Sequence, residues 1–379
     1  MKEKIRSINY CTHSNLNDLS FGDSNNDNKF INSIPSKFYV NKVFPKRNKD
    51  NSIKFLNLLK IVLKLLFLSV KYKQIFLIRG TRPGFLPVFF KKMMKHIIIL
   101  NMGCTPFSTI ERTAFMSNPS YKPKFNIISK LLIKIEFQFE KLLIRKADFI
   151  FVENLTAKRL VTKFCSNAAK ITILPYYVQD YFLINKDLTY NPNDLKQLVI
   201  GYTGRFHKYD KLDPLIDAIK ILKSENFPIK MKLVGDGPIK AEIQKKVKNL
   251  KLEENFEFLG PQPHEKVSEI IDTEHILILP MINNICPTTI PIKILEGIIK
   301  GKIILTNNSG NIRSLFRPYN ELVLQDFSNP KKIAKKIIEI AQNYQKYYHI
   351  AQIIRKRHLE SRNIQYFKNQ IERTLNLIN

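Results

Sequence analysis

The chain has 379 residues, of which 44% are hydrophobic and 25% are charged; this composition is typical of folded globular proteins and excludes a disordered chain. Lysine and arginine (62) outnumber aspartate and glutamate (32), which gives a formal net charge of +30. The length predicts two domains of ordinary size. The charge indicates either an anionic partner or a lysine-rich composition without functional meaning, and both interpretations stay open.

Much of the positive charge lies in the first half of the chain. Residues 37–146 contain 23 basic and only four acidic residues. An anionic partner is therefore expected near this part of the protein. A nucleic acid is not expected as that partner, because the aromatic residues occur in apolar runs such as 89–90 and 137–139 and do not alternate with the basic residues.

The cysteines and the N-terminus indicate a cytoplasmic protein. No Cys-x-x-Cys pair and no histidine at metal-ligand spacing accompany the cysteines, so neither a zinc site nor a disulfide framework is expected. The first residues become polar after Ile5 and lack the apolar core of a signal peptide. The cysteines are Cys11, Cys104, Cys165 and Cys286.

The first half of the chain predicts an α/β domain that begins with loops. Residues 11–52 are rich in asparagine, serine, aspartate and lysine, a composition that favours loops with little regular structure. Helices and strands then alternate, which predicts parallel strands joined by right-handed crossovers. The predicted helices are 53–70, 84–95, 127–146 and 155–164, and the predicted strands are 75–79, 97–101, 148–152 and 171–174.

The helix predicted at 53–70 is the most apolar segment of the chain. Lys54, Lys60 and Lys64 interrupt it at intervals that a membrane-spanning helix does not favour. The lysines form a narrow basic stripe on a broad apolar helix. Two interpretations stay open: the helix lies on an anionic membrane surface, or it is a buried helix of the domain with one edge in water.

The second half repeats the α/β alternation after a polar linker at 186–196. Because single helices separate the strands, we expect a doubly wound parallel sheet whose ligands bind at the carboxyl ends of the strands. The predicted strands are 198–203, 231–234, 255–258, 276–279, 302–306 and 321–324. The predicted helices are 211–224, 238–250, 264–271, 291–300, a short one near 311, and long helices from 330 to the end.

Two of these strands end in glycine turns. Gly201-Tyr202-Thr203-Gly204-Arg205 closes the first strand; glycine allows a phosphate to approach the backbone, and an arginine presents two parallel donors to phosphate oxygens. Gly235-Asp236-Gly237-Pro238 closes the second strand, with the proline at the favoured first position of a helix. Each turn by itself is equally compatible with an ordinary connection between a strand and a helix.

A third candidate is the helix that Pro291 opens. Free backbone N–H groups near 288–292 and the positive end of the helix dipole predict an anion site. Glu296 lies about one turn further along, where its carboxylate can accept hydrogen bonds from sugar hydroxyls.

The order of these motifs resembles the donor lobe of glycosyltransferase family 4 over about residues 197–345. The motifs are Gly204-Arg205, Gly235–Pro238, Phe258–Gly260, Leu277–Pro280 and Pro291-x-Lys293-x-x-Glu296. The resemblance implies a GT-B fold, in which two Rossmann-like doubly wound lobes face a central cleft. It assigns 1–185 to an acceptor-binding lobe, 197–350 to a nucleotide-sugar-binding lobe, and 351–379 to helices that pack back toward the first lobe.

The resemblance also implies roles for individual residues. Arg205 and Lys211 neutralise the donor diphosphate, with Lys208 as the alternative if the register of that loop differs, and Glu296 holds the ribose hydroxyls. The other donor-binding residues are Gly204, Gly235, Leu259, Gly260, Thr288, Thr289, Ile290 and Lys293.

Side-chain cations replace a metal in this family, so no metal and no cofactor are expected. The implied activity is retaining transfer of a sugar from a UDP- or GDP-linked donor to a glycan or lipid-linked acceptor. Such a reaction belongs to polysaccharide or glycolipid biosynthesis, in the cytoplasm or on the inner membrane face.

The chain departs from the family pattern at three places. Thr288 stands where the family usually has the first of two glutamates, and Gly22 is a single glycine where many members have a pair. No histidine follows the strand 97–101, where Asn101 stands instead, and His96 before it is expected at the surface. Thr288 is interpreted as a character of a subfamily with a Pro-Thr-x-Ile-Pro-x-Lys-x-x-Glu loop. The departures also leave open an alternative function, in which a catalytically degenerate protein binds a nucleotide or an anionic glycan without turnover.

Acceptor contacts are expected in the loops that follow the strands of the first lobe. A lipid diphosphate or an acidic glycan would explain the basic residues there, and the alternative is a solvated basic rim. The candidates are Arg79, Arg82, Glu111 and Arg112, together with Gly22 and Asn101.

Overall fold

The computed structural model describes most of the chain in two compact units. The first unit comprises Met1–Glu111, Pro123–Tyr176 and Ile364–Asn379, and the second comprises Arg112–Lys122 and Tyr177–Asn363. The residues described are 6–12, 22–44, 55–80, 82–102, 127–165, 167–184, 197–207, 210–280, 290–307, 312–319, 323–324 and 327–378. Within these ranges, no helix has both the length and the apolar character needed to span a bilayer.

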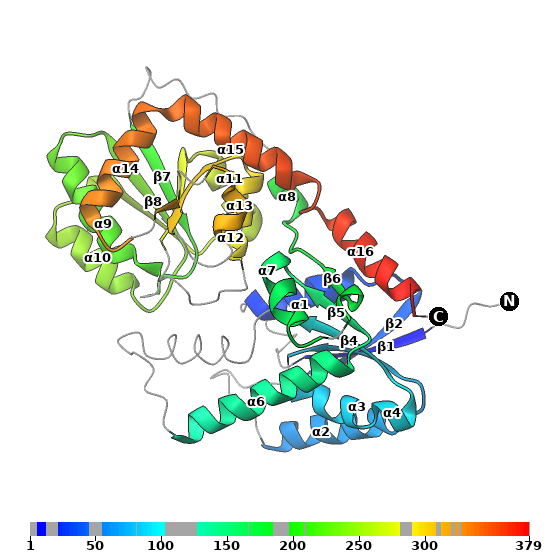
Figure 1. Cartoon of the computed structure of the whole chain (residues 1–379). Helices are drawn as coiled ribbons and strands as arrows, with labels where there is room; N and C mark the ends of the chain where they lie inside the picture. Colours follow the sequence, from blue (N-terminus) through cyan, green and yellow to red (C-terminus); the bar gives the residue numbers. More distant parts are fainter. Residues whose placement is uncertain are drawn as a thin grey trace. The chain divides into compact units, whose positions relative to one another are not determined.

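The first unit is built on a parallel six-stranded sheet of order β2-β1-β3-β4-β5-β6 (Figure 1). Its strands are β1 (Arg6–Thr12), β2 (Phe38–Val43), β3 (Ile75–Arg79), β4 (Ile97–Met102), β5 (Phe149–Val152) and β6 (Ile171–Ile173). Its helices are α1 (Gly22–Asn32), α2 (Phe55–Ser69), α3 (Phe85–Phe89), α4 (Lys91–Met94), α6 (Ile127–Lys146), α7 (Leu155–Thr162) and α16 (Ile364–Asn376), with 3-10 turns at Arg82–Gly84 and Ala168–Lys170.

Helices cover both faces of this sheet. One face packs against α2, α3, α6 and α7, whose apolar side chains join those of β3, β4 and β5 in a single buried cluster. On the other face Phe30 of α1 contacts the rings of Tyr10, Phe151 and Phe367, which brings α16 onto the sheet. The last helix of the chain is therefore part of the first unit.

The prediction of loops over residues 11–52 was wrong, because this segment supplies part of β1, all of β2 and α1. Several polar residues of these elements are buried and hydrogen-bonded: Thr12 is 2% exposed, and its hydroxyl donates to Oδ2 of buried Asp27 at 2.8 Å. Asn9 is 2% exposed and donates to the carbonyl of Ile75 at 3.3 Å, and Asn41 donates to the Asn9 side chain at 2.9 Å. A buried polar residue is stable when its hydrogen bonds are satisfied, and the sequence alone does not show those partners.

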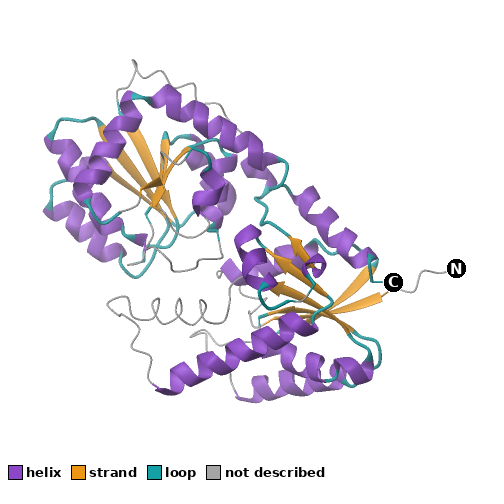
Figure 2. Ribbon diagram, in the orientation of Figure 1, coloured by secondary structure: helices purple, strands orange, loops and turns teal. Residues whose placement is uncertain are grey.

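The second unit contains a parallel six-stranded sheet of order β12-β11-β10-β7-β8-β9 (Figure 2). Its strands are β7 (Leu198–Thr203), β8 (Ile229–Val234), β9 (Phe256–Gly260), β10 (Ile276–Leu279), β11 (Ile303–Asn307) and β12 (Val323–Leu324). Its helices are α8 (Asp180–Leu183), α9 (Leu212–Ser224), α10 (Lys240–Asn249), α11 (His264–Asp272), α12 (Ile292–Ile299), α13 (Ile312–Phe316), α14 (Pro330–Gln342) and α15 (Tyr344–Leu359), with a 3-10 turn at Glu253–Asn255.

Helices lie on both sides of this sheet too. Helix α9 packs with α10 and α14, and α12 packs with α15. The helices of segment 351–379 divide between the units, because α15 belongs to the second unit and α16 to the first. The predicted linker 186–196 lies outside the described residues. Two doubly wound α/β units are therefore present, as the alternation of the sequence predicted.

Glu274 is a buried carboxyl group beneath the second sheet. Its residue is 0% exposed, and its carboxyl oxygens accept no hydrogen bond within the described part of the chain. A Cβ atom on Gly201 of β7 would lie 1.8 Å from that carboxyl, which explains the glycine at this position. Burial raises the pKa of Glu274 to about 8, although Lys302 and Lys232 act in the opposite direction.

This raised pKa predicts a pH dependence of stability. Near neutral pH the folded protein keeps the proton on Glu274 while the unfolded chain has lost it, so the residue makes the fold less stable as the pH rises from 6.5 to 7.5. Glu274→Gln keeps the shape and removes the titration. We expect its free energy of unfolding to fall less steeply over this range, by about 1 kcal/mol per pH unit. Urea unfolding at pH 6.5, 7.0 and 7.5 measures it.

Glu140 in the first unit provides an independent comparison. Burial, and then the charge of Glu136, raises its pKa to about 8 as well. Glu140→Gln should change the pH slope in the same direction. If the free energy of unfolding of Glu274→Gln changes with pH as steeply as that of the unchanged protein, Glu274 is already charged in the folded state.

Candidate functional site

The order of the second sheet indicates where a ligand binds. After β9 the chain returns past β7 to form β10 on its other side, so the strand order reverses between β7 and β10. In open parallel sheets, ligands bind outside the carboxyl ends of the strands at such a switch point. The segment after β7 and the start of α12 therefore form the candidate site.

Gly204, Gly235 and Gly260 lie at the ends of neighbouring strands in the candidate site and contact one another through their backbones. The N–H of Gly204 donates to the carbonyl of Val234 at 2.9 Å, and the N–H of Gly235 donates to the carbonyl of Gly260 at 2.8 Å. The three glycines have φ angles of +143°, +130° and +64° in chain order. A Cβ atom on Gly235 would come within 1.9 Å of the Gly204 carbonyl oxygen. Both the close approach and the positive φ therefore require glycine at 235.

Lys293 joins the first turn of α12 to the end of β7. Its Nζ forms an ion pair with Asp210 Oδ1 at 3.0 Å, donates to the Tyr202 hydroxyl at 3.3 Å and lies 4.7 Å from the centre of the Tyr202 ring. A Cβ atom on Gly204 would lie 3.2 Å from the same nitrogen. The Lys293 side chain is 19% exposed and that of Asp210 is 2% exposed. A largely buried cation thus lies directly beside the glycine turn.

Two further cations predicted from the sequence lie in the same loop. The hydroxyl of buried Tyr202 donates to the carbonyl of Arg205 at 2.9 Å and fixes the turn, while the Arg205 side chain is exposed. Lys211 is half-buried, directly follows Asp210 and precedes α9 with a left-handed backbone (φ 44°). Arg205 and Lys211 therefore lie in the segment between β7 and α9, whose Asp210 pairs with Lys293 of α12. Lys208 lies outside the described residues.

The start of α12 has backbone donors and no side-chain cap. Pro291 is the N-cap residue, and it offers no side-chain hydrogen bond to the N–H groups of the first turn. A negatively charged ligand is the usual partner of such groups. Ile290 before it is buried, and Leu259 at the end of β9 is half-buried beside Gly260. Thr288 and Thr289 lie outside the described residues.

Glu296 is held by residues that the sequence analysis missed. It is 5% exposed, and its Oε1 lies 2.7 Å from Nε2 of His264, whose Nδ1 lies 2.6 Å from the hydroxyl of Tyr181. Because a carboxylate only accepts, the proton of a neutral imidazole is on Nε2, and the tyrosine hydroxyl donates to Nδ1. Burial, followed by the charges of Glu296 and Glu265, raises the pKa of Tyr181 to about 12.

This chain of contacts orients the Glu296 carboxylate. His264 opens α11 and Tyr181 lies in α8, which Ser268 of α11 holds through its hydroxyl and the Tyr181 carbonyl at 2.9 Å. The one feature of the sequence that could have indicated His264 is its position four residues after the Phe258–Gly260 motif. Tyr181 is 83 residues from His264, and no local pattern connects the two residues.

The acceptor-side candidates of the first unit are partly engaged in ion pairs. Arg79 at the end of β3 pairs with the fully buried carboxylate of Asp27, and Arg82 pairs with Glu136 at 2.6 Å on the surface. Asn101 near the end of β4 is half-buried opposite Arg79 in the register. Gly22 is the first residue of α1, and Glu111 and Arg112 lie outside the described residues.

Asp27 organises a polar cluster that the sequence did not reveal. It accepts hydrogen bonds from the hydroxyls of Tyr10 and Thr12, each at 2.8 Å, besides its contact with Arg79. Burial and the nearby Asp27 charge raise the pKa of Tyr10 well above its ordinary value. The cluster lies where the order of the first sheet reverses, between β1 and β3. Arg79 is therefore fixed in place at the switch point of the first unit.

The expectation that His96 lies on the surface was wrong. The residue is 3% exposed; its Nδ1 accepts from the N–H of Gln74 at 3.3 Å, and its Nε2 is 2.8 Å from the carbonyl of Ser69. Burial lowers the pKa of His96. The side chain links α2 to β3 and β4 and serves the fold.

The described residues contain no cluster of three or more histidine, cysteine, aspartate or glutamate side chains arranged to hold a metal ion. The cysteines described, Cys11 and Cys165, are buried free thiols.

Part of the chain matches a described family of domains. Residues 185–357 match the family model "Glycosyl transferases group 1". A stretch of 84 residues is 29% identical to "Putative glycosyltransferase EpsF" of Bacillus subtilis (strain 168) and covers 22% of this chain. That stretch spans 21% of the length of the curated relative it matches.

Solved structures share the whole fold at low sequence identity. Sucrose-phosphate synthase from Thermosynechococcus elongatus aligns with a TM-score of 0.73 and 13% identity, over 98% of this chain and 99% of that chain. Anabaena Alr3699/HepE in complex with UDP aligns with a TM-score of 0.68 and 12% identity, over 98% and 100%. The lipopolysaccharide outer core galactosyltransferase WaaB aligns with a TM-score of 0.60 and 14% identity, over 98% and 100%. The predicted GT-B fold is thereby confirmed.

The contact between the glycine turns generates a first prediction for this site. Gly235→Ala places a methyl group against the Gly204 carbonyl oxygen, and we expect it to lower stability by about 2–4 kcal/mol and to weaken binding of anionic ligands. Gly260→Ala is the matched control, because its φ is also positive but a Cβ atom there meets nothing within 4 Å. Its expected loss is about 1 kcal/mol. Equal losses in urea unfolding would contradict the close packing of the two turns.

Proposed function

We propose that this chain, whose residues 185–357 form a group 1 glycosyltransferase domain within a GT-B fold, is a retaining glycosyltransferase. The donor is a UDP- or GDP-linked sugar, and the acceptor is a glycan or a lipid-linked glycan at the cytoplasmic membrane face. The observation that carries the proposal is the contact of Lys293 with the Gly204 turn at the switch point of the second sheet, with Glu296 one turn further along the same helix.

The cations of the site bind the donor diphosphate in this proposal. Lys293 lies beside Gly204, where the missing side chain allows the ammonium group to approach the turn. Asp210 neutralises the Lys293 charge, so Arg205 and Lys211 supply the excess positive charge that a diphosphate requires. The N–H groups at the start of α12 add donors along the helix dipole.

Glu296 binds the ribose hydroxyls through the carboxylate that His264 orients. His264 occupies Oε1 at 2.7 Å, so the carboxylate is fixed and Oε2 faces the ligand in this proposal. A preorganised acceptor costs less conformational entropy on binding than a mobile one. His264 is thus a positioning residue, since it acts through Glu296.

The same cations stabilise the charge that develops during transfer. The bond between the anomeric carbon and the diphosphate oxygen breaks, the acceptor oxygen bonds to that carbon on the same face, and the departing phosphate oxygen takes the acceptor proton. Charge therefore accumulates on the phosphate, where fixed positive groups are most effective. This route requires no protein base, which agrees with Asn101 in the first unit.

The structural relatives support a nucleotide sugar as the donor class. HepE structures contain UDP, UDP with glucose, and UDP-glucose. A TarM structure contains fondaparinux, alpha-GlcNAc-glycerol and UDP, which supports a glycan-type acceptor. Sequence identities of 12–15% leave the particular sugar and acceptor of this chain to experiment.

A specific observation favours a second candidate function. Thr288 replaces the first glutamate of the family pattern, which agrees with a degenerate protein that binds nucleotide or anionic glycan without turnover. Donor binding is common to both functions, and only turnover separates them.

We predict that the protein binds UDP or GDP in calorimetry with EDTA present, because side chains neutralise the diphosphate. Glu296→Ala should weaken the affinity about tenfold or more, the effect of losing a hydrogen bond to a charged group. Glu265→Ala is the control, since that carboxylate is exposed on α11. Absence of nucleotide binding, or equal affinities of the two variants, would remove the donor-site assignment.

His264 predicts an intermediate effect. His264→Ala leaves Glu296 unoriented, so we expect nucleotide affinity to fall about three- to tenfold. His264→Gln retains an N–H donor for the carboxylate and should recover most of the affinity. If both substitutions reduce affinity equally, orientation by the imidazole is not the cause.

Turnover is tested with labelled nucleotide sugars and a membrane extract that supplies acceptors. Transfer of label that Arg205→Ala abolishes supports the transferase. Nucleotide binding without transfer from any UDP- or GDP-sugar supports the degenerate protein.

A further inference from the structure

The first unit exposes a broad apolar surface on α2, α3, α4 and α6, which we name the α2–α6 face. Folded monomers rarely leave so many large apolar side chains in water. The helices that carry them lie together along one side of the sheet (Figure 1). The most exposed members are Phe67 (61%), Phe89 (72%), Met93 (62%), Ile127 (86%), Ile128 (67%) and Leu131 (56%), and the others include Leu58, Leu59, Val62, Leu63, Val70, Phe85 and Leu132.

The charge around this surface is almost purely positive. Residues 55–95 contain nine lysines and arginines and no acidic residue. On α6 five basic residues accompany two glutamates; Glu136 is paired with Arg82, and Glu140 is 4% exposed with a pKa raised to about 8 by burial. An anionic occupant therefore matches the α2–α6 face better than a neutral or cationic one.

A lysine lies close to an aromatic ring near the end of α2. Lys71 Nζ lies 4.3 Å from the centre of the exposed Phe67 ring. This combination suits the boundary between acyl chains and headgroups, where the ring enters the apolar layer and the ammonium group remains at the phosphates.

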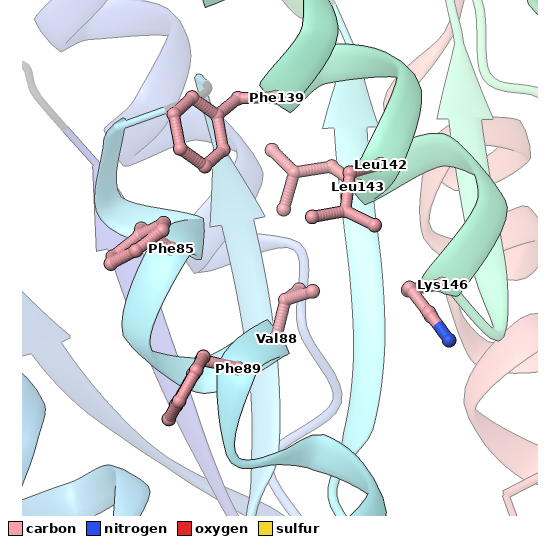
Figure 3. A pocket seen from close by; sticks show the side chains of 7 residues that line it. All are labelled: Phe85, Val88, Phe89, Phe139, Leu142, Leu143 and Lys146. Carbon is pink, nitrogen blue, oxygen red and sulfur yellow. The ribbon is translucent and has the colours of Figure 1, made fainter.

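An apolar groove between α3 and α6 opens on the same unit (Figure 3). It encloses about 120 Å³, and Lys146 is its one charged lining residue. The rings of Phe85 and Phe139 meet edge to face at 5.0 Å across it, and the exposed ring of Phe89 forms one border. The other lining residues are Val88, Leu142 and Leu143. Such a groove has room for part of a hydrocarbon chain, with the ammonium group of Lys146 at its edge.

We propose that the α2–α6 face docks on an anionic phospholipid bilayer, with an acyl chain in the α3–α6 groove and the lysines at the headgroup phosphates. The biological use of this docking rests on the proposed function, because docking would bring the enzyme to a lipid-linked acceptor. The docking itself is inferred from the surface. A second copy is a poorer occupant: a two-fold contact would set the same basic surface against itself and oppose like charges.

Vesicle flotation tests the proposal with the full chain. We expect binding to vesicles of phosphatidylcholine with 30% phosphatidylglycerol, little binding to phosphatidylcholine alone, and loss of binding at high salt. Lys60→Glu/Lys92→Glu/Lys134→Glu should abolish it, because the three exposed lysines lie on α2, α4 and α6. The control Lys220→Glu/Lys245→Glu/Lys248→Glu changes the net charge equally on exposed sites of α9 and α10 and should bind as the unchanged protein does.

Tryptophan fluorescence tests the groove, because the chain contains no tryptophan. Phe89→Trp should shift to the blue on binding anionic vesicles and be quenched by brominated acyl chains. Ile184→Trp, at a 67% exposed position in the second unit, should do neither.

Three results would overturn the inference. They are equal binding of the protein to both vesicle types, an equal loss of vesicle binding in the two lysine triple variants, or Phe89→Trp fluorescence that brominated acyl chains do not quench. A dimer in light scattering that Phe67→Ser/Phe89→Ser converts to a monomer would instead assign the face to self-association. Calorimetry with UDP distinguishes a failure of membrane docking from a failure of the proposed donor site. The α2–α6 triple should bind nucleotide normally, and Glu296→Ala should still bind vesicles.

Discussion

The contact between two glycine turns is the constraint on which the candidate site depends. The Gly204 carbonyl lies where a Cβ atom of residue 235 would be, so the ends of β7 and β8 meet with no side chain between them. The contact therefore requires glycine at position 235. Lys293 reaches the turn from α12 because Gly204 presents no side chain to block it.

Helix α12 concentrates two buried charged groups one turn apart. Asp210 forms an ion pair with Lys293, and His264 forms a hydrogen bond with the Glu296 carboxylate, so each of the two groups has a polar partner within the protein. An uncompensated charge at this depth would destabilise the fold. The partners come from the loop before α9 and from α11, which means that three crossover connections of the second unit must form before the site exists.

Helix α2 of the first unit has apolar side chains both on its buried side and on its exposed side. Leu65 and Leu68 of α2 join the core cluster, whereas Leu63 and Phe67 of the same helix remain in water. An apolar helix can thus be part of a domain core and still expose a second apolar stripe. The two interpretations of segment 53–70, a core helix and a membrane-facing helix, are compatible for this reason.

The sequence by itself determined the α/β class, most elements after residue 53 and the glycine and proline positions of the second unit, because local periodicity and turn chemistry encode them. It did not reveal β1, α1 and β2, whose polar residues are satisfied only by distant partners such as Asp27 for Thr12. Nor did it reveal His264 and Tyr181 behind Glu296, or which side of α2 faces water. These features depend on contacts between residues far apart in the chain, and only the tertiary structure decides such contacts.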